Sequence, residues 1–144
     1  MKVAINASYG GFGLSPEALK LYCEKAGISC YFFKYEYTTE PTLRSKLVPA
    51  YDLTDHGKYS RDNLAFSIPN PQEQKNPHDY RIGDGFTDDR TNKFLIEAIE
   101  ELGSEAASGS SCKIKIVEVP DDVKWHIAEY DGWEWVAEDH RKWE

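Results

Sequence analysis

The stretch Asn-Ala-Ser-Tyr-Gly-Gly-Phe-Gly-Leu-Ser, residues 6 to 15, joins an expected strand to an expected helix through three glycines. The preceding segment, Lys2 to Ala7, alternates polar and apolar residues, which predicts a short strand. Ser15 can cap a helix and Pro16 suits its first position. Glycine permits φ > 0 and close backbone approach, and a helix start offers unpaired N–H donors. The segment therefore predicts a pocket that accepts negative charge.

The residues after Pro16 continue this pattern into a helix and a second strand. The helix is expected to end at Gly27, and its apolar stripe consists of Leu19, Tyr22, Cys23 and Ala26. Ile28 to Tyr37 is rich in aromatic residues, which favours a strand. A strand, a helix and a strand in this order predict a parallel β-α-β unit with a right-handed crossover.

The central part of the chain loses this periodicity. We expect one domain over residues 1–144 with an irregular excursion at about 38–85, which holds five of the seven prolines. Short elements are expected around Leu43 to Tyr51 and Leu64 to Ile68, together with one mobile loop. A functional lid and a partner-contacting surface are the alternatives for this excursion.

The C-terminal half predicts a helix, a strand and a hairpin. Thr87 or Asp88 is expected to cap the helix, whose buried stripe is formed by Leu95, Ala98, Ile99 and Leu102. Cys112 to Val119 reads as a strand with Ile114 and Ile116 pointing inward. The expected fold is therefore α+β, with a mixed β-sheet, two helices packed on one face and a C-terminal β-hairpin.

The hairpin is expected over Trp125 to Glu138, because Asp131-Gly132 suits a type I′ turn. In this register one face pairs Tyr130 with Trp133 and Ala128 with Trp135, and the other pairs Ile127 with Val136. Glu129 lies opposite Glu134, an arrangement that like-charge repulsion disfavours. Either a bulge separates the two carboxylates or a cation, such as one from a neighbouring subunit, lies between them.

Composition limits the classes of function. The formal charge of −8 disfavours direct nucleic-acid binding, which depends on clustered Lys and Arg. Cys23, Cys30 and Cys112 are odd in number and form no C-x-x-C pair, so reduced thiols are expected. Since the sequence shows neither a signal peptide nor a long apolar run, we expect no membrane association and a cytoplasmic location.

The glycine segment supplies the candidate binding site. It is neither a P-loop nor a dinucleotide fingerprint. An amide, a phenol and a hydroxyl gather there with backbone donors, and two arginines near the second helix could clamp a phosphate. The candidate ligand-binding residues are Asn6, Tyr9, Gly10, Gly11, Phe12, Gly13, Ser15, Arg81 and Arg90. The alternatives are a tight structural turn stapled by Phe12 and Leu14, and arginines paired with Asp84, Asp88 or Asp89.

No catalytic residue, metal ligand or cofactor is assigned. The four histidines lack metal-ligand spacing, and no serine lies in a nucleophile elbow. Glu129 and Glu134 could act as a general acid and base, although a solvated strand face is the simpler explanation. The aromatic residues Tyr130, Trp133 and Trp135 suit a core, a subunit contact or a stacking ligand.

Four strings of sequence stand out: Tyr-Gly-Gly-Phe-Gly-Leu-Ser-Pro-Glu-Ala at 9–18, Ile-Glu-Glu-Leu-Gly at 99–103, Ile-Val-Glu-Val-Pro-Asp-Asp-Val-Lys-Trp at 116–125 and Glu-Tyr-Asp-Gly at 129–132. Together they resemble a family of small, functionally uncharacterised proteins of tailed bacteriophages and prophages, for which the expected location is the cytoplasm of the host cell. Residues 38–85 lie outside the resemblance. The resemblance implies an accessory protein that manipulates the host, by blocking a defence system or by withholding a nucleotide signal.

Three functions follow from these observations. The first is binding of a nucleotide-like or other anionic small molecule, which would sequester a host defence signal. The alternative is a protein-interaction module that occupies the surface of a host protein. The third is a small nucleotide-processing enzyme that uses Glu129 or Glu134. A homo-oligomer formed through the aromatic hairpin is expected in addition.

Overall fold

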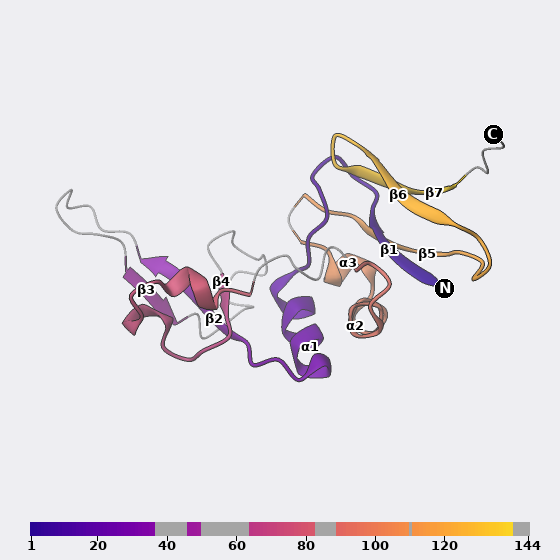
Figure 1. Cartoon of the computed structure of the whole chain (residues 1–144). Helices are drawn as coiled ribbons and strands as arrows, with labels where there is room; N and C mark the ends of the chain where they lie inside the picture. Colours follow the sequence, from indigo (N-terminus) through magenta and orange to yellow (C-terminus); the bar gives the residue numbers. More distant parts are fainter. Residues whose placement is uncertain (37–45, 50–63, 83–88, 110, 140–144) are drawn as a thin grey trace, which may run out of the picture.

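The computed structural model describes residues 1–36, 46–49, 64–82, 89–109 and 111–139. These residues form an α+β fold with three sheets, and every strand pairing within them is antiparallel. Figure 1 shows the three-stranded sheet at one end of the view and the two-stranded sheets at the other. Within the described ranges, none of the helices combines the length and apolar character needed to span a bilayer.

A two-stranded ribbon carries the glycine segment. It pairs β1 (Lys2–Asn6) with β5 (Ile114–Glu118). One core cluster joins side chains of this ribbon to the two longer helices, α1 (Pro16–Ala26) and α2 (Lys93–Leu102); its members include Ala4, Ile114, Ile116, Tyr22, Cys23, Leu95 and Ile99. A second cluster joins Val3, Ile5 and Val119 to hairpin residues. The ribbon therefore contributes to two cores.

The expected parallel β-α-β unit is wrong. The strand that follows α1, β2 (Tyr31–Glu36), lies in a different sheet from β1. It pairs with β3 (Lys46–Pro49) on one side and β4 (Leu64–Phe66) on the other, in the order β3-β2-β4. Alternation identified the first strand and aromatic content the second, but neither pattern determines which strand pairs with which.

This three-stranded sheet has a small core of its own, formed by Phe33, Leu64 and Phe66. The rings of Phe33 and Phe66 meet edge to face with centroids 5.5 Å apart. Strands β3 and β4 lie in the stretches where short elements were expected, and the 3₁₀ helices η1 (Pro71–Glu73) and η2 (Pro77–Tyr80) follow. Residues 38–45, 50–63 and 83–85 of the expected excursion lie outside the described residues, and the expected mobile loop stays a prediction.

Helix α1 is capped as expected. Ser15 Oγ accepts the Ala18 N–H at 3.2 Å, Pro16 occupies the first turn, and Gly27 ends the helix at φ 72°. The expected cap of α2 at Thr87 or Asp88 is wrong, because Asn92 caps that helix. Its Oδ1 accepts the N–H groups of the second and third helical residues, at 2.9 and 3.2 Å. The short helix α3 (Ser104–Ala107) follows directly.

The hairpin of β6 (Trp125–Tyr130) and β7 (Trp133–Glu138) has the expected register. Tyr130 pairs with Trp133, and Glu129 pairs with Glu134. The turn residues Asp131 and Gly132 have φ of 50° and 88°, as a type I′ turn requires. The turn and the four cross-strand pairs expected from the sequence are confirmed, and Glu129 pairs with Glu134 without the bulge that was one alternative.

Candidate functional site

Asn6, the first candidate ligand-binding residue, is fully buried and bonded inside the protein. Its Nδ2 donates to the carbonyls of Ser8 and Gly132, each at 2.9 Å. Its Oδ1 accepts from Ser8 Oγ at 2.8 Å and from the Lys113 N–H at 2.9 Å. The amide thus connects the glycine segment, the hairpin turn and the segment entering β5.

Ser15 and Gly13 contact the chain around α3. Ser15 Oγ donates to the Ala106 carbonyl at 2.7 Å, and the Ser15 N–H donates to the Ala107 carbonyl at 2.9 Å. The Gly13 carbonyl accepts from the Gly109 N–H at 2.9 Å. Residues 106 to 109 therefore pack against the start of α1, in the space where an anion was expected.

Two glycines are required by close backbone packing. A Cβ added to Gly10 would lie 1.7 Å from the Ser111 carbonyl oxygen, and one added to Gly132 would lie 2.8 Å from the Gly11 nitrogen. Gly11 itself has φ 82°, in the left-handed region that favours glycine. Glycine is needed at positions 10 and 132 because the backbone at Ser111 and the backbone of the glycine segment approach them too closely for a side chain.

The two candidate arginines occupy different surroundings. Arg90 forms a bidentate ion pair with the buried carboxylate of Glu134, and its guanidinium lies 3.8 Å from the centroid of the Phe12 ring. Arg81 is exposed, and its backbone forms an isolated antiparallel β-bridge with Phe66 of the three-stranded sheet. Asp89, one expected partner of the arginines, accepts hydrogen bonds from Thr91, and Asp84 and Asp88 lie outside the described residues.

The glycine segment therefore has the contacts of a tight structural turn, which was the alternative to a ligand site. Asn6, Ser15 and Arg90 each bond to other parts of the chain. Anion binding by the nine residues stays a prediction. Tyr9 differs from the others, because it is 64% exposed and its ring lies edge-on to Trp133, with centroids 5.0 Å apart.

Tyr9 extends a surface that we call the aromatic face, defined by Tyr9, Tyr130, Trp133 and Trp135. The hairpin register directs Tyr130, Trp133 and Trp135 to one side, and these side chains are 72%, 40% and 46% exposed. Residues on the opposite side, including Ile127 and Val136, pack against β1 and β5. The hairpin thus covers the ribbon with one side and presents aromatic rings on the other.

The hairpin and the residues that flank it carry an excess of negative charge. Residues 121–139 contain seven carboxylates and a single lysine. The exposed carboxylates closest in sequence to the turn are Glu129 and Asp131, and Glu138 and Asp139 lie at the other end of the hairpin. Asp139 contacts His126 Nδ1. The arrangement is suited to cations and opposes anionic ligands.

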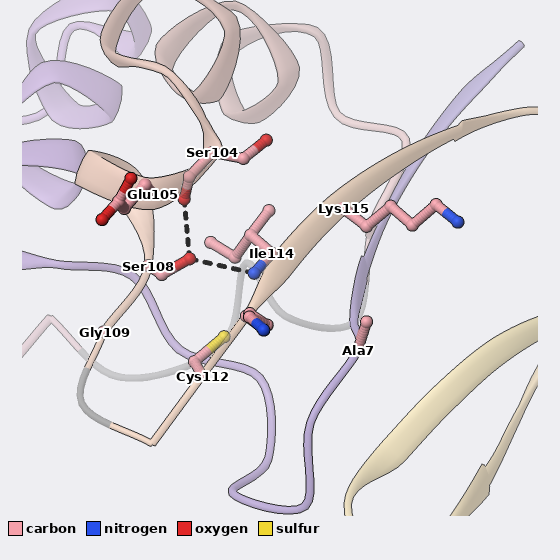
Figure 2. Close-up of a pocket in the computed structure, with 9 residues that line it drawn as sticks. Ala7, Ser104, Glu105, Ser108, Gly109, Cys112, Ile114 and Lys115 are labelled. Carbon is pink, nitrogen blue, oxygen red and sulfur yellow. Dashed lines mark hydrogen bonds between the residues drawn. The ribbon is translucent and has the colours of Figure 1, made fainter.

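A cavity of about 730 Å³ lies between α3 and the start of β5. Figure 2 shows Ser104, Glu105 and Ser108 on one side of it and Cys112, Ile114 and Lys115 on the other. Ser108 Oγ donates to the Ser104 carbonyl at 2.6 Å and accepts the Ile114 N–H at 2.9 Å. None of the candidate site residues predicted from the sequence lines this cavity.

Burial raises the pKa of the Cys112 thiol beside this cavity. Within the part of the chain that the structure describes, no three His, Cys, Asp or Glu side chains gather as a metal site. Comparison of the chain with protein-family models, with curated proteins and with solved structures finds no match.

Proposed function

We propose that the protein is a protein-interaction module and that the aromatic face binds a basic surface of another protein. One observation carries the proposal: Trp133 and Trp135 point outward from β7 while Glu134 between them is buried. The strand therefore places its two tryptophan side chains in solvent and the carboxylate between them inside.

Exposed tryptophan and tyrosine are the residues that most often dominate protein–protein binding energy. Each combines a large apolar surface with a polar group and few rotatable bonds. Four of them gather here from the glycine segment and the hairpin, and Tyr9 supports Trp133 through an edge contact. A contiguous aromatic surface of this kind favours an interface over a solvated strand face.

The charge of the hairpin favours a basic partner. Seven carboxylates and one lysine lie in residues 121–139. Arg90 pairs with Glu134, the N-terminal ammonium pairs with Asp121, and His126 contacts Asp139. Arginine and lysine side chains bind both to carboxylates and to the faces of tryptophan rings. A nucleotide phosphate would meet repulsion on the same surface, which supports a protein partner over the anionic ligand.

The sequence resemblance to phage proteins supports a host protein as this partner. In that case the module would act by occupying a basic surface that the host protein needs, as in the blocking of a defence system. Occupation requires affinity and complementary shape and no catalytic group.

The experiment is affinity capture from bacterial lysate with the full chain immobilised, followed by calorimetry with the purified partner. We compare the unmodified chain with the double variant Trp133→Ser/Trp135→Ser. The matched control is Tyr80→Ser, which removes an exposed aromatic ring (38% exposed) from η2, far along the chain from the hairpin.

We expect stoichiometric capture of a protein with a basic surface, lost in the double variant and kept in the control. The affinity should fall as salt is raised, because exposed charge pairs are screened. Capture that survives the double variant contradicts the proposal. A calorimetric signal with nucleotides that is unchanged in the double variant would instead support the anionic-ligand hypothesis.

A further inference from the structure

We infer that the outer edge of β5 accepts an extended segment of another protein as an added strand, and that this segment alternates apolar and acidic residues. The inference is independent of the aromatic face. It concerns the side of the β1–β5 ribbon that faces the cavity beside α3 (Figure 2).

The hydrogen bonds of β5 define which of its backbone groups point outward. The Lys113 carbonyl accepts from the Ala7 N–H at 2.7 Å, and the Val119 N–H donates to the Met1 carbonyl at 2.8 Å. Odd-numbered residues therefore bond toward β1. In an antiparallel pair the alternate residues point away from the partner, so Ile114, Ile116 and Glu118 direct their N–H and C=O groups to the outer edge.

The two edges of the ribbon differ in how they are covered. On the outer edge of β1, the Ala4 N–H donates to the Arg90 carbonyl at 2.9 Å and the Asn6 N–H donates to Glu134 Oε1 at 2.8 Å. On the outer edge of β5, Ser108 Oγ covers the Ile114 N–H. Among the described residues β5 ends its sheet, so no strand pairs with this edge. Unpaired strand edges are templates for added strands.

The cavity adjoins the first half of β5, where Ser108 Oγ holds the Ile114 N–H. It has a volume of about 730 Å³ and is lined by Ser104, Glu105, Ser108 and Gly109 on one side and by Ala7 and Cys112 to Lys115 on the other. An extended chain entering there would continue along Ile116 and Glu118.

The side chains of β5 determine the sequence that such a segment needs. Ile114 and Ile116 lie on the face that joins the helical core, where an added strand would place apolar residues. Lys113 and Lys115 are exposed and lie on the other face, where an added strand would place carboxylates. Alternating apolar and acidic residues therefore satisfy both faces over the stretch from Lys113 to Ile116.

The same lysines disfavour a second copy of this chain as the occupant. Self-pairing of β5 centred on Lys115 or Ile116 would place the two Lys115 side chains opposite or diagonal to each other. Like charges at these positions destabilise a strand pair. An acidic segment of a different protein is therefore the favoured occupant.

The test uses fluorescein-labelled peptides of alternating valine and glutamate, or alternating valine and lysine, and measures fluorescence anisotropy with the full chain. We expect the glutamate peptide to bind and the lysine peptide not to bind. Glu118→Pro removes an outward N–H without changing the ladder to β1, and should weaken binding about tenfold or more. Glu118→Gln keeps that N–H and is the matched control.

The charge-reversal variant Lys113→Glu/Lys115→Glu should exchange the preference, so that the lysine peptide binds. Circular dichroism of each variant verifies folding. Equal binding to Glu118→Pro and Glu118→Gln, or no binding of the glutamate peptide, overturns the inference. A dimer in analytical ultracentrifugation that Glu118→Pro dissociates would overturn it in favour of a second copy. Trp133→Ser/Trp135→Ser should bind the peptide normally. Failure of strand addition at β5 can therefore be distinguished from failure of binding at the aromatic face.

Discussion

Arg90 and Glu134 join the chain before α2 to the hairpin through two parallel hydrogen bonds. Nη1 lies 2.7 Å from Oε1 and Nη2 lies 2.9 Å from Oε2, and the two side chains are 11% and 9% exposed. Oε1 also accepts the Asn6 N–H at 2.8 Å. The Glu134 carboxylate therefore connects the chain before α2, the hairpin and the end of β1.

We expect Arg90→Met to destabilise the protein by about 3–5 kcal/mol, because it leaves the buried Glu134 carboxylate without its cation. Urea denaturation followed by circular dichroism measures this. Lys93→Met is the control, since Lys93 forms an exposed pair with Glu97 at 3.9 Å and such pairs contribute about 0.5 kcal/mol. Equal losses in the two variants would show that the buried pair has no special role.

Asn6→Ala should cost about 2–4 kcal/mol, because it removes four hydrogen bonds at a fully buried position. Asn6→Asp should also destabilise, since a carboxylate cannot donate to the Ser8 and Gly132 carbonyls. Thermal unfolding distinguishes both from Asn92→Ala, the loss of one helix cap worth about 1 kcal/mol. An Asn6→Ala variant as stable as Asn92→Ala would contradict the conclusion that the Asn6 side chain makes four buried hydrogen bonds.

Gly132→Ala should destabilise more than Gly27→Ala. Both glycines have positive φ, at 88° and 72°, so both substitutions strain the backbone by about 1 kcal/mol or more. At Gly132 the new Cβ also meets the Gly11 nitrogen at 2.8 Å, whereas the space at Gly27 is open. The midpoints of denaturant unfolding give the difference, and identical midpoints would exclude the close approach of the hairpin turn to the glycine segment.

The Cys112 thiol should react more slowly with iodoacetamide at pH 8 than a free cysteine does. Burial raises the pKa of this thiol, and only the thiolate reacts, so less of the reactive form is present at that pH. The rate should keep rising as the pH passes the ordinary thiol pKa. Peptide-resolved mass spectrometry measures the rate at Cys112, and a rate that levels off below pH 8.5 would contradict the prediction.

Trp135→Ser should change stability by less than about 1 kcal/mol, because the ring is exposed on the aromatic face. Ile99→Ala, at a fully buried position in the helical core, should cost about 2–5 kcal/mol. A large loss of stability in Trp135→Ser would show that the ring packs in the core and is not available to bind a partner.

Local features of the fold were predictable from the sequence. Ser15, Pro16 and Gly27 delimit α1 by their individual chemistry. Asp131-Gly132 fixes the hairpin turn, and the turn then fixes the facing of Tyr130 with Trp133. The same register placed Glu129 opposite Glu134 and gave a bulge and a nearby cation as the two alternatives; a cation lies beside Glu134.

Long-range relationships were not predictable in the same way. The cation beside Glu134 is Arg90 of the same chain, although the sequence suggested Arg90 as a phosphate ligand and a neighbouring subunit as the source of the cation. The signal was present, because Glu134 shares its face with Ile127 and Val136 and therefore points inward. The pairing of β1 with β5 left no such signal, because an alternating pattern shows which side chains of a strand face the core but not which strand lies beside it.

The backbone contact between Gly132 and Gly11 gives the aromatic face a built-in spectroscopic reporter. An amide chemical shift changes with small movements of the neighbouring backbone. The Gly11 amide adjoins the hairpin turn, and Gly11 has no side chain that a partner could contact. Resonance assignment of this single glycine would thus reveal when the hairpin is occupied, without a label on the binding surface.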